Sequence, residues 1–245
     1  MSDEKPTIDR QSRALAGCCG FGESRRNYFR RLRLVEVQDT FFMPPQNKTL
    51  TRWRQDGGDD FVFVIKAWQL ITHEADAKGY RRLARDFSVD SKQCGRFQNT
   101  EEVATAYART ADAADILRAS AILFETPPSF TPTQDNRSKI AAFFERIDRR
   151  GRKMIWDARG VWSSTEVVSI ATDLDLIPCS DLAQAPLSTK ASYVRILGGR
   201  HSEETLYRLV DVLADVESAY CLFNTINMFR DALRLQSFFD STDLD

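Results

Sequence analysis

Eight short apolar runs, most of them followed by a helix-forming segment, constrain the fold of this chain more than any other feature. The runs are nearly continuous in apolar residues, which is typical of parallel strands that are covered on both faces. An alternation of strands and helices along the chain predicts an α/β fold. The predicted strands lie within residues 14–20, 34–38, 61–66, 121–125, 154–162, 176–181, 192–197 and 219–224.

The most economical arrangement of eight such strands is a single (β/α)8 barrel, the TIM barrel, for which 245 residues are an ordinary length. We assign residues 14–245 to this domain and expect the polar residues 1–13 to form a flexible tail. The barrel should be somewhat irregular, because the long connection 67–100 is typical of a functional loop or of an excursion with its own helices. The alternative is a doubly wound open sheet, which prefers a GxGxxG loop that residues 17–22 do not provide.

Charge and cysteine content narrow the class of protein further. The net charge of −1 argues against a broadly basic surface for nucleic acid, although basic residues within 81–96 could contact phosphates locally. No apolar run reaches the roughly 18–20 residues that cross a membrane, and the polar start of the chain lacks the core of a signal peptide. The five cysteines form no CxxC pair and fit reduced, buried thiols. We therefore expect a cytoplasmic protein with no membrane partner, and leave its oligomeric state open.

Several predicted strands end on charged residues that share a face with apolar residues. Because side chains alternate across a strand, Ile155, Asp157 and Arg159 lie on one face. The C-terminal ends of parallel barrel strands meet at one mouth, where TIM-barrel active sites lie. The side chains expected at this mouth are Glu36, Gln38, Lys66, Glu125, Asp157, Arg159, Asp181, Arg195 and Asn224, with His73 just beyond the third strand.

Two acids and a histidine of this set are the catalytic candidates. Burial raises the pKa of one carboxyl group while a neighbouring cation keeps another ionised, so Glu36 and Asp157 are candidates for acid–base catalysis. His73, which is predicted to lie in the loop after the third strand, could carry a proton between the site and solvent.

The remaining residues of the set are assigned to substrate binding. Lys66, Arg159 and Arg195 would form a cationic floor for a phosphate or carboxylate group, to which arginine makes bidentate contacts. A small anionic ligand is therefore the expected partner. The other members of the substrate-binding set are Gln38, Glu125, Asp181 and Asn224.

Two other interpretations of these residues stay open. In the first, the charges form a structural ion-pair network, with Glu36 paired to Arg195 or Asp157 paired to Lys66. In the second, four side chains hold a metal ion, which the adjacent basic residues disfavour. With two histidines a three-histidine zinc site is excluded, and the sequence identifies no cofactor. The four residues of the metal interpretation are Glu36, Asp157, Asp181 and His73.

Several short motifs stand in a specific order along nearly the whole chain. They are GCCGF (17–21), VEVQDTFF (35–42), FVFVIKA (61–67) with ITH (71–73), LFETPPSF (123–130), WDARGVW (156–162), YVRILG (193–198) and FN (223–224). Their order and spacing resemble those of the YecE-like family, or domain of unknown function 72, and residues 94–97 look like its archaeal branch. The resemblance implies a TIM barrel and implies no reaction.

The chain departs from the family pattern at the expected mouth. The family usually has a glutamate at Asp157, a glutamine at Glu125, a histidine at Leu197 and a second asparagine at Thr225. The shorter acid retracts its carboxylate by one methylene, and the missing histidine removes an acid–base group. Three hypotheses follow: a hydrolase- or lyase-like enzyme for a small anionic or phosphorylated substrate, a non-catalytic anion-binding or protein-interaction barrel, and a nucleic-acid-processing enzyme that uses residues 81–96.

Overall fold

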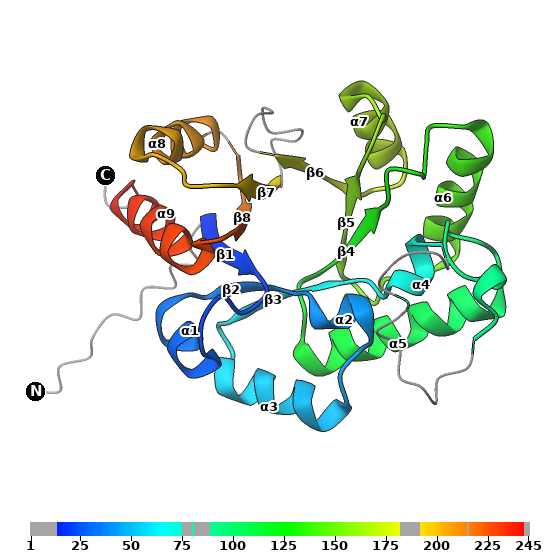
Figure 1. Ribbon diagram of the computed structural model, residues 1–245, viewed down its shortest axis with the longest axis horizontal. Helices are drawn as coiled ribbons and strands as arrows, with labels where there is room; N and C mark the ends of the chain where they lie inside the picture. The colour runs from blue at the N-terminus through cyan, green and yellow to red at the C-terminus, as the bar shows by residue number, and fades with distance from the viewer. Residues whose placement is uncertain (1–13, 75–79, 81–88, 182–191, 215, 243–245) are drawn as a thin grey trace, which may run out of the picture.

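The strands of the chain form one closed, parallel barrel (Figure 1). The computed structural model describes residues 14–74, 80, 89–181, 192–214 and 216–242. Its strands are β1 (Ala14–Cys19), β2 (Leu34–Val37), β3 (Val62–Lys66), β4 (Ala121–Thr126), β5 (Lys153–Ala158), β6 (Ile177–Asp181), β7 (Ser192–Gly198) and β8 (Ala219–Thr225). Each strand pairs with its neighbours in chain order, and β1 also pairs with β8. This closure confirms the predicted (β/α)8 barrel and excludes the open sheet.

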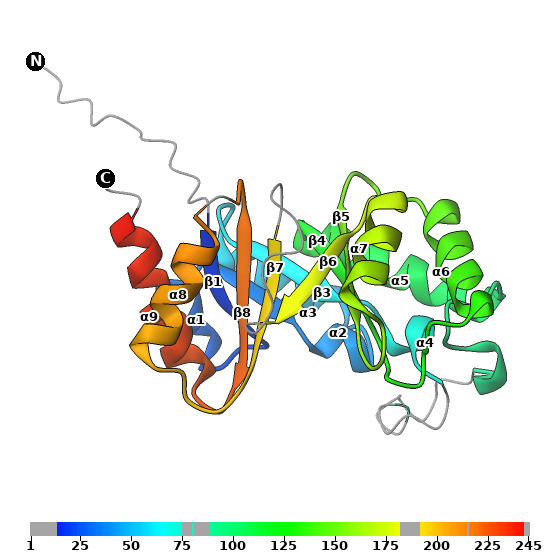
Figure 2. The ribbon, with the colours of Figure 1, turned by 90° about the horizontal axis from the view of Figure 1, so that it is seen from above.

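Helices cover the outside of the barrel, with α8 and α9 at one end of the molecule and α5 and α6 at the other (Figure 2). Among the described residues, no helix is long and apolar enough to cross a membrane. The helical elements are α1 (Arg25–Arg31), α2 (Asp39–Phe42), α3 (Asn47–Gly57), α4 (Gln69–Thr72), the 3-10 helix η2 (Ser91–Gln93), α5 (Glu101–Leu117), α6 (Gln134–Arg146), α7 (Ser164–Asp173), α8 (Glu203–Val212) and α9 (Met228–Thr242).

Both faces of the strands are apolar, which explains why the apolar runs of the sequence are nearly continuous. On β4, Ile122 and Phe124 pack outward into the core shared with the helices, while Leu123 belongs to the cluster inside the barrel. Toward the C-terminal ends of the strands, the interior positions change from apolar to charged. The apolar interior includes Leu15, Leu34, Val64, Leu123, Ile155 and Leu222.

The connection between β3 and α5 is an excursion with helices of its own, one of the two forms that the sequence indicates for residues 67–100. It contains α4 and η2. Residues 75–79 and 81–88 of this connection lie outside the described residues, as does the predicted tail at residues 1–13.

The segment after η2 returns to α4 and holds it in place. The backbone N–H of Gly95 donates to the carbonyl of Leu70 at 2.7 Å, and that of Phe97 donates to Ile71 at 2.9 Å. Gly95 has a φ of +81°, and a Cβ there would lie 2.2 Å from the carbonyl oxygen of His73, so glycine is required. This close approach fixes the backbone that carries His73.

Candidate functional site

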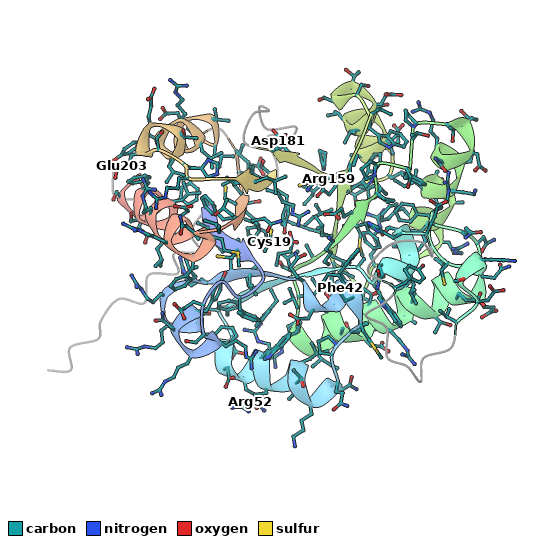
Figure 3. All side chains as sticks on the ribbon, viewed as in Figure 1. Cys19, Phe42, Arg52, Arg159, Asp181 and Glu203 are labelled. Atoms are coloured by element: carbon teal, nitrogen blue, oxygen red, sulfur yellow. The ribbon has the colours of Figure 1, made fainter. Side chains whose placement is uncertain are left out.

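Charged side chains from five strands and one loop meet inside the C-terminal end of the barrel. Most follow an apolar interior residue by two positions along their strand, as the alternation of side chains requires. Figure 3 labels Cys19, Arg159 and Asp181 around the opening of the barrel. We name this set the mouth cluster, and it consists of Glu36 on β2, Lys66 on β3, Glu125 on β4, Asp157 on β5, Arg159 just after β5 and Arg195 on β7.

The guanidinium of Arg195 joins the acids of the mouth cluster. Its Nη1 donates to Oε2 of Glu125 and to Oδ2 of Asp157, each at 2.6 Å. Its Nη2 donates to Oε1 of Glu36 at 3.1 Å. Burial opposes the charge of Arg195, but these carboxylates outweigh it and raise the pKa of Arg195 well above its ordinary value. One buried cation therefore compensates carboxylates from β2, β4 and β5, each of which would be costly to bury alone.

Glu36 is completely buried and accepts hydrogen bonds on both carboxylate oxygens. The hydroxyl of Tyr193 donates to Oε2 at 2.6 Å, and the amide of Gln38 donates to Oε1, which also accepts from Arg195. Tyr193 was not among the residues predicted from the sequence. It lies two positions before Arg195 and therefore on the same face of β7, and this spacing was the signal that could have identified it.

Lys66 lies between an acid and an aromatic ring. Its Nζ is 2.9 Å from Oε1 of Glu125 and 4.0 Å from the centroid of the Phe41 ring, a cation–π distance. The ring of His73 packs edge-on against Phe41, with centroids 4.9 Å apart, and its Nδ1 is 2.8 Å from Oγ1 of Thr72. Phe41 was not predicted, because it lies in the short helix α2, where strand alternation gives no signal.

Arg159 connects two acids on the more open side of the mouth cluster. Its Nη2 lies 2.7 Å from Oδ2 of Asp157 and 3.9 Å from Oε2 of Glu125. The Arg159 side chain is 29% exposed, whereas Lys66 is 7% and Arg195 is 3% exposed. Arg159 is therefore the cation of the mouth cluster that solvent or a ligand reaches most easily.

Glu125 and Asp157 are partners in the β4–β5 register, yet their pKa values shift in opposite directions. Burial opposes ionisation of Glu125, but Lys66 and Arg195 outweigh it and lower the pKa of Glu125 to about 2. Burial raises the pKa of Asp157, and the nearby Glu125 adds to this rise, although the guanidinium groups of Arg195 and Arg159 oppose it. Burial also lowers the pKa of His73 to about 4, with Glu125 opposing and Lys66 reinforcing this effect. Near pH 7, Glu125 is therefore ionised and His73 is neutral.

The structure distinguishes between the two ion pairs considered from the sequence. Glu36 pairs with Arg195, whereas Lys66 pairs with Glu125 and not with Asp157. The reason is strand order: β3 lies beside β4, while Asp157 lies one strand further away on β5. Asp157 instead pairs with the two arginines of the mouth cluster.

The other predicted residues lie at the edge of the mouth cluster. Gln38 is half-buried and bonded to Glu36. Asp181 is half-buried at the end of β6, where it is the register partner of Arg195. Asn224 is exposed near the end of β8, and within the described part of the chain no hydrogen bond joins it to the mouth cluster.

The side chain of Arg195 lies between Glu36 and Asp157. Arg195 contacts Glu36 with one terminal nitrogen and Asp157 with the other. Among the described residues, no group of three or more His, Cys, Asp and Glu side chains is placed to hold a metal ion. The set considered from the sequence is therefore not brought together as a group of ligands, and it comprised Glu36, Asp157, Asp181 and His73.

The basic segment 81–96 is described only in part, since residues 81–88 lie outside the described residues. Lys92 is exposed. Arg96 is half-buried, and its guanidinium lies 2.9 Å from Glu74 and 3.0 Å from Asn136. Arg96 therefore already has partners within the protein.

Fold and site together define the class of this protein: a single TIM barrel with a charged site at the C-terminal ends of its strands, where TIM-barrel enzymes carry their active sites. The model of a family described as "Protein of unknown function DUF72" matches residues 22–242. The chain belongs to this family, which confirms the resemblance found in the sequence. No curated protein matches the chain.

Solved structures share this fold. A DUF72 family protein from Enterococcus faecalis V583 has a TM-score of 0.70 at 14% identity, covering 93% of this chain and 97% of its own. A DUF72 family protein from Thermotoga maritima MSB8 has a TM-score of 0.66 at 16% identity, covering 93% and 99%. SacUVDE has a TM-score of 0.58 at 10% identity, covering 89% and 85%. At these identities the likeness shows the fold alone.

Proposed function

We propose that the mouth cluster is an active site and that the protein is a hydrolase- or lyase-like enzyme for a small anionic or phosphorylated substrate. The observation that supports this most is the opposed shift of two neighbouring carboxyl pKa values, downward for Glu125 and upward for Asp157. Carboxyl groups whose pKa values are pushed apart are a frequent mark of acid–base catalysis. Asp157 is therefore the member best suited to exchange a proton, while Glu125 stays ionised.

We propose that a bound substrate changes the proton affinity of Asp157 through Arg159. Arg159 is the most exposed cation of the mouth cluster, and its Nη2 lies 2.7 Å from the Asp157 carboxylate. An anionic group that binds Arg159 competes with Asp157 for this guanidinium. Weakening their ion pair raises the proton affinity of Asp157 when the substrate is in place.

Of the three cations predicted to bind the substrate, we propose this role for Arg159 alone. Lys66 and Arg195 already form ion pairs with carboxylates of the protein. We assign to Lys66 the role of keeping Glu125 ionised. Arg195 positions the acids of β2, β4 and β5 relative to one another, since it contacts all of them. Both side chains thus support the acids more than they bind the substrate.

Glu36 is proposed as the second group for proton transfer. The Tyr193 hydroxyl donates to Glu36 at 2.6 Å and positions its carboxylate, while burial and the nearby Glu36 raise the pKa of Tyr193 well above its ordinary value, so Tyr193 keeps its proton. His73, neutral near pH 7, is proposed to relay a proton on the side of α4. Further substrate contacts are proposed for the residues at the edge of the mouth, Gln38, Asp181 and Asn224.

The test is turnover of a panel of phosphorylated and carboxylated small molecules by the purified full chain. Asp157→Asn keeps the shape of the side chain and removes the proton-transferring group, so we expect a loss of turnover of about 100-fold or more. The matched control is Asp173→Asn at the exposed end of α7, which should keep the wild-type rate. Wild-type turnover by Asp157→Asn, or no turnover of any panel member by the wild type, would contradict the proposal.

One observation favours a second candidate function, a non-catalytic anion-binding or protein-interaction barrel. Carboxylates of the mouth cluster already partner each of its cations, Lys66, Arg159 and Arg195. A balanced network of this kind can act solely to hold the strand ends together. Ligand binding that Asp157→Asn leaves unchanged, without turnover, would favour this second candidate.

A further inference from the structure

A pocket of about 310 Å³, separate from the mouth cluster, lies where the loops after β7 and β8 meet. The helices that follow these loops, α8 and α9, lie side by side next to β7 and β8 (Figure 1). We name it the β7–β8 pocket. The side chains that line it include Arg200, His201, Asn227, Arg230, Asp231 and Arg234.

The β7–β8 pocket has more cationic than acidic side chains. Its two acids share one arginine: Nη1 of Arg234 lies 3.4 Å from Asp231, and Nη2 lies 3.8 Å from Glu203. Arg200 and Arg230 are exposed, and neither forms an ion pair with another residue that the structure describes. Two guanidinium groups of the pocket are therefore available to a ligand.

Two helix starts and a histidine add further polar groups to the pocket. Helix α8 has 10 residues and begins at Glu203, and helix α9 has 15 residues and begins at Met228. The first backbone N–H groups of a helix lack partners within the helix and carry the positive end of its dipole. In addition, Nε2 of His201 is buried and has no hydrogen-bond partner among the described residues. The start of α8 is already capped by the Ser202 side chain, which accepts from the N–H of Thr205, and it carries Glu203 and Glu204 in its first turn. The start of α9 and His201 are therefore the groups that can interact favourably with an anion.

We propose that the β7–β8 pocket binds the phosphate group of a small phosphorylated molecule. Guanidinium groups bind phosphate oxygens through pairs of hydrogen bonds, and helix starts also favour phosphate. A tetrahedral phosphate accepts hydrogen bonds from several directions, which suits donors that come from the loops after β7 and β8 and from α9. The pocket has about ten times the volume that one water molecule occupies in the liquid, so it also admits atoms attached to the phosphate.

Phosphate binding by this pocket does not depend on the chemistry of the mouth cluster. That the bound molecule is also the substrate rests on the proposed function, because the pocket and the mouth cluster both lie at the C-terminal ends of the strands. In that case the pocket holds the phosphate group, and the reacting part of the molecule meets Arg159 and Asp157.

The test is a calorimetric titration of the full chain with inorganic phosphate at low ionic strength. We expect Arg200→Ala/Arg230→Ala to bind phosphate at least about tenfold more weakly than the wild type. The control Arg26→Ala/Arg208→Ala removes the same net charge from exposed arginines of α1 and α8 and should bind like the wild type. Equal weakening in both double variants would indicate nonspecific attraction and overturn the proposal, as would a wild type that does not bind phosphate.

The variant Asp157→Asn separates this inference from the proposed function. If both hold, this variant keeps wild-type phosphate affinity and loses turnover, whereas Arg200→Ala/Arg230→Ala raises KM for a phosphorylated substrate more than it lowers kcat. Phosphate binding that is lost in Arg200→Ala/Arg230→Ala, by a protein without turnover, would support the pocket and contradict the proposed function. Turnover by a protein that binds no phosphate would support the proposed function and contradict phosphate binding by the pocket.

Discussion

The mouth cluster and the β7–β8 pocket are both charged, but their charges are compensated in opposite ways. Lys66, Arg159 and Arg195 each lie within 2.9 Å of a carboxylate. Arg200 and Arg230 form no ion pair with the described residues. Burial explains the difference, because a buried charge needs a partner within the protein whereas an exposed charge stays hydrated. The buried network can therefore hold its acids in fixed positions, while the exposed arginines gain partners only when an anion binds.

The largest expected effect contrasts a buried with an exposed arginine. Arg195→Met leaves the acids Glu36, Glu125 and Asp157 without their shared cation, and we expect a loss of about 3–5 kcal/mol in the free energy of unfolding. Arg200→Met, at an exposed position, should change it by less than about 0.5 kcal/mol. Denaturant titration measures both values. Similar losses in the two variants would mean that burial does not distinguish the two regions.

The pH dependence of stability is the next largest effect, and it comes from His73. Its folded-state pKa of about 4 lies below the ordinary value of 6.5, so between these pH values the unfolded chain takes up a proton that the folded chain does not. The stability that neutral His73 contributes is therefore present above about pH 6.5 and is lost as the pH falls toward 4, by roughly 3 kcal/mol at most.

Unfolding curves at several pH values between 4 and 7 test this prediction in the wild type and in His73→Gln. Asp157 has a raised pKa and therefore affects the pH dependence of stability in the opposite direction, but this effect is present in both proteins. The difference between their pH dependences therefore isolates the contribution of His73. Arg230→Ala in the β7–β8 pocket should keep the wild-type slope. An unchanged slope in His73→Gln would show that His73 is not held neutral by the fold.

A smaller effect is expected from a single hydrogen bond of the mouth cluster. Tyr193→Phe removes the donor to Oε2 of Glu36, and leaving this buried oxygen without it should lower the free energy of unfolding by about 1–3 kcal/mol. The matched control is Tyr207→Phe on α8, where the residue is 52% exposed and its ring stacks on Phe238, and it should change stability little. Equal stability of the two variants would argue that Glu36 does not depend on Tyr193.

The sequence was sufficient to predict the barrel and the strand ends that carry charge. Alternation along each strand placed Asp157 and Arg195 at the mouth before any pairing was known. The choice of partners was not predictable, because it depends on strand neighbours and on the reach of each side chain across the barrel. Lys66 therefore pairs with Glu125 and not with Asp157, and Tyr193 joins Glu36 from the far side.

The β7–β8 pocket was not predicted, and its origin in loops and helix starts explains why. Strand and helix periodicity indicates the direction of a side chain only within a regular element. Arg200 lies in the loop after β7, and Arg230 lies in the first turn of α9, far away in the sequence. The pairing of β7 with β8 and the packing of α8 beside α9 bring them to one pocket (Figure 1).

The response to salt is the smallest expected effect and compares the two regions directly. Raising the ionic strength from about 0.05 M to about 0.5 M shortens the screening length severalfold, which acts on hydrated charges far more than on buried pairs. Phosphate affinity at Arg200 and Arg230 should therefore fall severalfold, while the stability difference between the wild type and Arg195→Met stays nearly constant. Calorimetry and denaturant titration at both ionic strengths measure these quantities. A stability difference that declined with salt as phosphate affinity does would mean that the mouth cluster is hydrated like the pocket, and that its acids are not held in the dry environment that raises the pKa of Asp157.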